Sequence, residues 1–113
     1  MSLDIPDNAT SISVFQLQDL RQAGVPHTVL DVREPDELAI CRVENAIHIP
    51  MAQVPQRLSE LPADRPLVVM CHHGMRSLRV VNFLRGNGFD NAINLDGGID
   101  AWAAEIDPAT GRY

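Results

Sequence analysis

The chain has 113 residues, 45% of them apolar, which is enough for one compact domain with a buried core but leaves no room for a second core. Its net charge of −6 disfavours binding to nucleic acid or to an anionic membrane, and no apolar run approaches the ~20 residues that cross a bilayer. All nine basic residues are arginines, which excludes lysine chemistry such as Schiff-base catalysis, and the first residues lack a secretory signal, which predicts a cytoplasmic protein.

The chain opens with signals for a helix and then a strand. Ser13 and Gln16 have the spacing of a capping box, which predicts a helix over residues 14–23 that ends at Gly24. A run of branched apolar residues at 27–32 follows, and this composition indicates a short buried strand.

The middle of the chain continues the alternation. Residues 34–37 carry a proline near the start of a predicted helical turn, and 46–50 form a second strand candidate. A further helical segment is expected to end at Pro62. Its apolar face is formed by Val54, Leu58 and Leu61.

The second half has the same order of elements. The continuous apolar run at 66–70 is typical of a strand covered on both faces, and 91–95 is predicted to be another strand. Between them, a helix that breaks at 86–88 is expected to bury one face, formed by Leu78, Val81 and Leu84 and widened by Val80. A turn at 96–98 precedes a short helix that buries Ile99 and Trp102, and the tail at 107–113 is expected to be frayed. The alternation predicts an α/β fold with a mainly parallel sheet and helices on both faces.

One loop carries the strongest chemical signal. Cys71 directly follows the apolar strand at 66–70, and ligands of open α/β sheets bind beyond the carboxyl ends of the strands. Backbone N–H groups of such a turn, aided by the positive end of the next helix, stabilise a thiolate and lower its pKa. Gly74 permits a positive φ in the loop, and Arg76 offers a cation to an incoming anion. The loop therefore predicts a reactive cysteine.

Three segments together resemble the rhodanese family: CHHGMRS at 71–77, LDVRE at 30–34 and LDGGIDAW at 95–102. The resemblance implies a single rhodanese-like domain over 1–113, with its core at about 11–104. It also implies a sulfurtransferase without metal or cofactor, in which Cys71 takes a sulfane sulfur from a donor such as thiosulfate and passes it to cyanide or a thiol. The substrate and persulfide loop would comprise His72, His73, Gly74, Met75, Arg76 and Ser77.

Three alternatives remain on the same loop. A carrier module would receive its sulfur from a protein partner and deliver it to cofactor or tRNA thiolation. A phosphatase or arsenate reductase needs a wider ring of amides for a tetrahedral oxyanion, and only four residues separate Cys71 from Arg76. A catalytically dead scaffold of this family usually lacks the loop cysteine, which this chain retains.

The remaining polar residues are expected to have mainly structural roles. Adjacent side chains diverge, so His72 and His73 are expected to shape the rim of the loop and not to bind a metal or act as a base. Asp31 and Arg33 are expected to pair, and Cys41 is expected to pack in the interior, with a resolving thiol as the alternative. Residues 41–46 depart from the family's usual Gly-His-Ile-Pro-Gly-Ala stretch, which leaves the path of this connection open. The other residues expected to be structural are His27 and His48. Arg79 is expected to add to the positive electrostatic field of Arg76.

Overall fold

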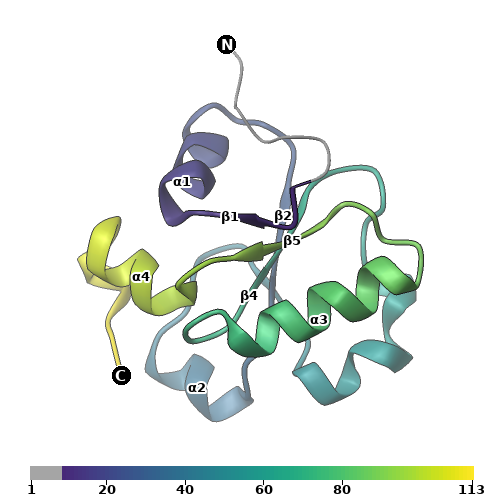
Figure 1. Cartoon of the computed structure of the whole chain (residues 1–113). Coiled ribbons are helices and arrows are strands. Elements are labelled where there is room, and N and C mark those ends of the chain that lie inside the picture. The colour runs from purple at the N-terminus through teal and green to yellow at the C-terminus, as the bar shows by residue number, and fades with distance from the viewer. Residues whose placement is uncertain (1–8) are drawn as a thin grey trace.

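A five-stranded sheet in the order β1-β5-β4-β2-β3 forms the centre of the molecule, and all its pairings are parallel (Figure 1). The computed structural model describes residues 9–113, so residues 1–8 of the predicted domain lie outside the described residues. The strands are β1 (Ser11–Ile12), β2 (Thr28–Asp31), β3 (Ile47–His48), β4 (Leu67–Met70) and β5 (Ala92–Leu95). The α-helices are α1 (Val14–Gln22), α2 (Pro35–Ile40), α3 (Met75–Gly86) and α4 (Gly98–Glu105). The 3-10 helices are η1 (Met51–Gln56), η2 (Leu58–Glu60) and η3 (Pro108–Thr110). The predicted fold class is confirmed.

The central strand β4 divides the core into two layers. Val68 and Met70 pack into the cluster that contains the buried residues of α1 and α4, whereas Leu67 and Val69 pack into the cluster of α3 and η1. Figure 1 shows the same division, with α1 and α4 on one side of the sheet and α3 on the other. Successive side chains of a strand point to opposite faces, so the next residue on the α3 side is Cys71.

The local signals of the first helix are confirmed. Ser13 Oγ accepts a hydrogen bond from the N–H of Gln16, and the Gln16 side chain accepts one from the N–H of Ser13, which completes the capping box. The helix ends at its C-cap Ala23, and Gly24 then takes a φ of 66°. Trp102 of α4 is buried in the core as expected, beneath the Arg21 guanidinium of α1.

Two predictions about helical faces need correction. The segment with Val54 and Leu61 forms two 3-10 helices, because Pro55 has no N–H for an α-helical hydrogen bond. In α3 the buried stripe starts one residue earlier than expected, and Leu78 is 38% exposed. The stripe has i, i+3, i+4, i+7 spacing and consists of Ser77, Val80, Val81 and Leu84.

The connection that departs from the family pattern follows a regular path. Asn45 stands where the family often has its second glycine, and its φ of 64° is positive, as glycine permits and asparagine tolerates. Val43 is buried, and the carbonyl of Glu44 accepts a hydrogen bond from Arg21. The substitutions in 41–46 therefore keep the turn.

The tail at 107–113 is not frayed. Asp107 caps η3 by accepting a hydrogen bond from the N–H of Ala109, and the chain then returns over the carboxyl end of the sheet. Tyr113 donates its hydroxyl hydrogen to Glu37 Oε2 at 2.6 Å and accepts one from Arg33 at 3.0 Å. The expectation was wrong because these partners are far away in sequence.

A buried ion pair fixes the end of β2. Asp31 and Arg33 are 1% and 0% exposed, and Arg33 donates to both oxygens of the Asp31 carboxylate. Arg33 also donates to the carbonyl of Cys41 at 2.8 Å, and its own carbonyl accepts a hydrogen bond from His48 Nε2. The structural roles predicted for the ion pair and for His48 are confirmed, and His27 likewise donates to the carbonyl of Val25.

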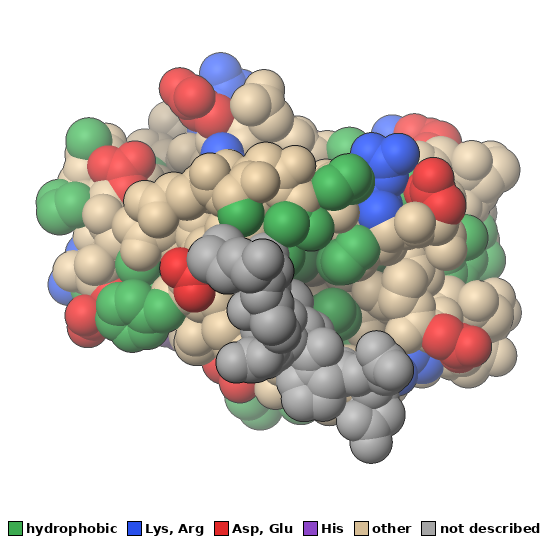
Figure 2. Space-filling view, turned by 90° about the horizontal axis from the view of Figure 1, so that it is seen from above, with side chains coloured by type: hydrophobic (Ala, Val, Ile, Leu, Met, Phe, Trp, Pro, Cys, Tyr) green, Lys and Arg blue, Asp and Glu red, His purple; other side chains and the backbone are tan. Residues whose placement is uncertain are grey.

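The surface shows no large segregation of charge on the face seen in Figure 2. Acidic and basic side chains are dispersed over that face, and apolar side chains gather near its centre. Within the described residues, none of the helices has both the length and the apolar character that a membrane span requires.

The buried pair gives a stability prediction. Replacing Arg33 with Met leaves the Asp31 carboxylate buried without its cation, which should lower the free energy of unfolding by about 3–5 kcal/mol in urea denaturation. Arg57→Ala is the control, because it removes an exposed ion pair with Glu60 and should leave the midpoint unchanged. Equal midpoints for the wild type and the Arg33 variant would contradict the role of this pair.

Candidate active site

The nucleophile candidate lies at the carboxyl end of β4, where the chain turns into α3. Cys71 is 1% exposed, and its sulfur faces inward toward the turn formed by the next residues. Gly74 is the N-cap of α3 with a φ of 108°, and the backbone of Gly97 lies 3.3 Å from where a Cβ would stand. Only glycine fits this turn without strain or displacement.

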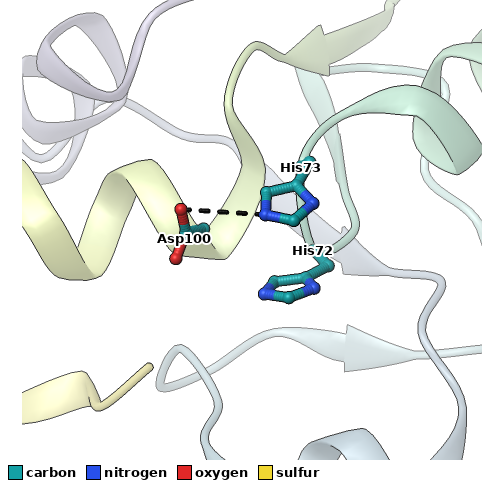
Figure 3. A group of neighbouring side chains, drawn as sticks. All are labelled: His72, His73 and Asp100. Carbon is teal, nitrogen blue, oxygen red and sulfur yellow. Dashed lines mark ion pairs between the residues drawn. The ribbon is translucent and has the colours of Figure 1, made fainter. Parts of the chain in front are cut away.

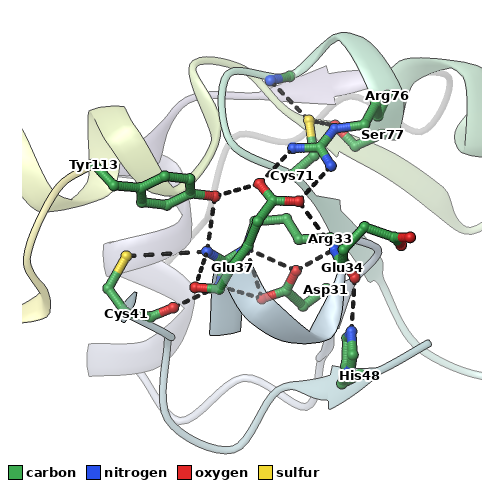
Figure 4. Close-up of polar contacts among 11 residues, drawn as sticks. Asp31, Arg33, Glu34, Glu37, Cys41, His48, Cys71, Arg76, Ser77 and Tyr113 are labelled. Carbon is green, nitrogen blue, oxygen red and sulfur yellow. Dashed lines mark hydrogen bonds and ion pairs between the residues drawn. The ribbon is translucent and has the colours of Figure 1, made fainter. Parts of the chain in front are cut away.

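Hydrogen-bond donors surround the sulfur. The N–H of Gly74 donates to Cys71 Sγ at 3.0 Å, and Ser77 Oγ lies 3.3 Å from the same atom (Figure 4). Burial is the largest influence on the Cys71 pKa and raises it. The Ser77 hydroxyl, when it donates to the sulfur, and the N–H groups of Ser77, Gly74 and His73 act in the opposite direction and leave the pKa below its ordinary value. The loop therefore favours a thiolate in a nearly water-free position.

The outer side of the loop is held by α4. The N–H of Ile99 donates to the carbonyl of Cys71 at 2.9 Å, and the N–H of Asp100 donates to the carbonyl of His72 at 3.1 Å. These are N–H groups of the first turn of α4, which have no partner within their own helix. The His72 carbonyl shares its peptide unit with the N–H of His73, so holding this carbonyl toward α4 turns the His73 N–H to the sulfur. Sequence reasoning missed this contact, although the Gly97-Gly98 pair was a signal of close backbone approach.

A second missed residue is Asn94 of β5. It is 3% exposed, its Nδ2 donates to the carbonyl of Gly74 at 3.2 Å, and its Oδ1 lies 2.5 Å from Ser77 Oγ. A buried asparagine in an otherwise apolar strand was the available signal, since such an amide requires partners.

The predicted loop residues separate into two groups. Gly74 and Ser77 contact the sulfur directly, and His73 contributes its backbone N–H. The side chains of His73 and Met75 are 64% and 72% exposed and thus do not line a closed pocket around Cys71.

Arg76 is not the unpaired cation that the sequence suggested. Its guanidinium donates to both oxygens of Glu37 at 2.6 and 2.8 Å (Figure 4). The hydrogen bond from Arg76 is the main reason that the pKa of Glu37 lies far below its usual range, and the pKa of Arg76 is raised in turn. Glu37 was not identified from the sequence, because its partner lies 39 positions away.

Tyr113 adds a second contact to this pair. Its hydroxyl bridges Arg33 and Glu37, and burial is the first cause that raises the pKa of Tyr113 to about 12. The core ion pair of Arg33 is thus linked through Tyr113 and Glu37 to Arg76 in the loop of Cys71. The second cysteine, Cys41, is a buried free thiol 3.9 Å from Arg33 Nη1.

His72, His73 and Asp100 are the side chains of the described region grouped closely enough to be considered for a metal (Figure 3). Their ligand atoms lie within 4.8 Å of one another, but the two imidazole rings stack at 3.9 Å between centroids with an interplanar angle of 23°. Lone pairs in stacked rings run side by side and do not converge on one point. Asp100 is also engaged by Arg112 through both carboxylate oxygens. The group is arranged by stacking and ion pairing and does not form a preorganised metal site.

The surroundings of His72 lower its pKa. Burial is the first cause that lowers the pKa of His72, and the adjacent His73 lowers it further. The ring of His72 lies between His73 and Tyr113, stacked on Tyr113 at 3.9 Å. His72 is therefore suited to a neutral, space-filling role at the rim.

The arrangement of strand, amide-lined loop and helix matches a known family. Residues 13–105 match the model of the rhodanese-like domain. The chain belongs to the rhodanese family. The putative sulfurtransferase YtwF of Bacillus subtilis is 35% identical over 97 residues, which cover 86% of this chain and 93% of that protein. The thiosulfate sulfurtransferase GlpE of Ectopseudomonas mendocina is 32% identical, with 89% and 91% covered.

Further rhodanese relatives differ in their overall organisation. The human single-domain sulfurtransferase TSTD1 superposes with a TM-score of 0.77 and 26% identity, covering 86% of this chain and 97% of that one. The Zea mays adenylyltransferase and sulfurtransferase MOCS3-2 is 32% identical over 95% of this chain, which spans only 24% of that longer protein. Sulfur transfer is the activity that these relationships support.

The contact between the loop and α4 predicts the effect of one methyl group. In Gly98→Ala the new Cβ would overlap the carbonyls of Cys71 and His72, and the φ of 59° would be strained. We expect a loss of about 1–3 kcal/mol in stability and slower alkylation of Cys71 at neutral pH.

Gly86→Ala is the matched control. A Cβ there meets nothing within 4 Å, so both quantities should stay at or slightly above wild-type values. Wild-type alkylation in Gly98→Ala would show that α4 does not orient the loop.

Proposed function

We propose that this chain is a sulfurtransferase that carries sulfur as a persulfide on Cys71. The Cys71 thiolate attacks the outer sulfur of a donor such as thiosulfate, the S–S bond of the donor breaks, and sulfite leaves with the electron pair. A thiophilic acceptor such as cyanide or a thiolate then attacks the terminal sulfur of the persulfide and regenerates the Cys71 thiolate. The observation that carries the proposal is the set of loop N–H donors around the sulfur.

The burial of Cys71 sets a condition on this reaction. At 1% exposure, the residue is reached by a donor only after side chains at the rim move. Once there, the terminal sulfur of the persulfide carries the negative charge, and the loop amides are placed to stabilise it in a low-dielectric setting. No metal or cofactor is needed for either half-reaction.

The ion pair between Arg76 and Glu37 affects the binding of an anionic donor. Arg76 directs two nitrogens to Glu37, so the cation for a dianionic donor is partly neutralised. The phosphatase alternative is disfavoured by the short loop, since only four residues separate Cys71 from Arg76.

A second candidate is the protein-fed carrier, in which a partner protein supplies or accepts the sulfur. The observation in its favour is that a similar domain occupies a quarter of MOCS3-2, whose name combines adenylyl and sulfur transfer. Slow turnover of free thiosulfate beside rapid loading from a protein persulfide would support this alternative. In both cases we place the protein in the cytoplasm.

The persulfide is tested by mass spectrometry of the intact protein. Wild type should gain one sulfur atom after exposure to thiosulfate and lose it on addition of cyanide. Cys71→Ser should gain none and should lack thiosulfate:cyanide transfer while keeping its fold. Cys41→Ser is the control and should behave like wild type, because the Cys41 thiol lies outside the loop. Substantial transfer by Cys71→Ser would overturn the proposal.

The ion pair predicts opposite effects of two substitutions on the KM for thiosulfate. Arg76→Ala leaves the Glu37 carboxylate without its cation near the donor and should raise KM roughly tenfold, the effect of about 1.4 kcal/mol. Glu37→Gln keeps the side-chain shape and the cap on the N–H of Glu34 but removes the negative charge and one of the two acceptors of Arg76, so KM should fall several-fold. The steady-state rate at varied thiosulfate measures both. A change of the same sign in both variants would show that the pair acts on structure and not on the donor.

A further inference from the structure

A buried polar chain beside Cys71 has no role in the transfer scheme above. Ser77 and Asn94 are 0% and 3% exposed, and they connect the sulfur to the turn after β5. Ser77 Oγ lies 3.3 Å from Cys71 Sγ and 2.5 Å from Asn94 Oδ1. The question is which of these two acceptors receives the single hydrogen of the Ser77 hydroxyl.

The orientation of the Asn94 amide is fixed by its other partners. Nδ2 lies 3.2 Å from the carbonyl oxygen of Gly74 and 3.2 Å from Asp96 Oδ1. Both of these oxygens accept hydrogen bonds and donate none, so the amide nitrogen must face them. Asn94 Oδ1 therefore faces Ser77.

The number of hydrogens on these side chains then decides which group donates in each hydrogen bond. Asn94 Oδ1 carries no hydrogen, so the contact at 2.5 Å requires the hydrogen of Ser77. When Cys71 is a thiol, its S–H hydrogen can point to Ser77 Oγ, and every group has a partner. When Cys71 is a thiolate, it has no hydrogen to give and competes with Asn94 for the hydrogen of Ser77.

Donation of the Ser77 hydrogen to the sulfur has an energetic cost. If the Ser77 hydroxyl turns to the sulfur, the lone pairs of Ser77 Oγ and Asn94 Oδ1 face each other in a buried position. In the persulfide the charge lies on the terminal sulfur, so Sγ no longer requires that hydrogen. The Ser77–Asn94 hydrogen bond is then compatible with the thiol and with the persulfide, whereas it leaves the free thiolate with the backbone N–H donors alone.

We propose that Asn94 is a positioning residue that withholds the Ser77 hydrogen from the Cys71 thiolate and so favours the persulfide over the free thiolate. The inference rests on the proposed function for the role of the persulfide, but the hydrogen competition does not depend on any sulfur donor. Ionisation releases the thiol hydrogen to solvent as a proton, and Ser77 rotates its O–H without breaking it.

The test is the pH dependence of Cys71 alkylation by iodoacetamide, measured in a Cys41→Ser background so that one thiol reports. Asn94→Leu removes the competing oxygen, and the midpoint of the alkylation rate should fall by roughly one pH unit, as expected for one hydrogen bond. Asn94→Asp keeps the acceptor and adds charge, so its midpoint should rise. The neighbouring ionisable groups stay the same in all variants; they are His72, His73, Arg76, Glu37, Asp96 and Asp100.

A control distinguishes competition for the Ser77 hydrogen from the other role of Asn94, its hydrogen bond to the Gly74 carbonyl. In a Ser77→Ala background no hydroxyl hydrogen remains to be shared, so Asn94→Leu should leave the midpoint where Ser77→Ala puts it. Circular dichroism checks the fold, and Asn94→Ala carries the same prediction if the leucine variant does not fold. An unchanged or raised midpoint in Asn94→Leu, or an equal shift in the Ser77→Ala background, overturns the inference. Failure of the proposed function would instead appear as a missing sulfur adduct in the mass spectrum.

Discussion

The first N–H groups of α4 hold the carbonyls of Cys71 and His72, and the chemistry of the loop follows from this contact. A peptide unit has its N–H and C=O on opposite sides, so fixing the His72 carbonyl outward turns the N–H of His73 inward. The donors thus arranged need no reorganisation when charge appears on the sulfur. Gly98 is required because the two backbones meet with no space for a Cβ. Two segments separated by a helix and a strand therefore form one site.

A second set of contacts joins the core to the rim. Arg33 is held by Asp31 inside the protein, Tyr113 connects it to Glu37, and Glu37 holds Arg76 next to the loop (Figure 4). Positive and negative groups alternate along this chain, so each charge has a partner. The charges around the rim therefore nearly cancel.

Local patterns predicted much of the fold and the position of Cys71 after a buried strand. The capping box at Ser13, the apolar run of β4 and the position of Cys71 after it depend on neighbours within a few residues, and the structure has each of these features. The residues that the sequence missed depend on contacts between distant segments. Glu37 and Asn94 contact the loop from α2 and β5, and Tyr113 returns from the last turn of the described chain. No spacing rule within one segment could place them there.

The alternation of side chains along β4 also decides on which face of the sheet Cys71 lies. Leu67, Val69 and Cys71 share one parity of the strand, and this parity points to the side of α3. Removing or adding a single residue within 67–70 would preserve an apolar strand but carry the thiol to the opposite layer, beneath α1 and α4. The sulfur would then lie on the side of the sheet where Met70 now packs, away from α3. A relative of this fold could therefore lengthen β4 by two residues, but not by one, and still present its cysteine to the same loop.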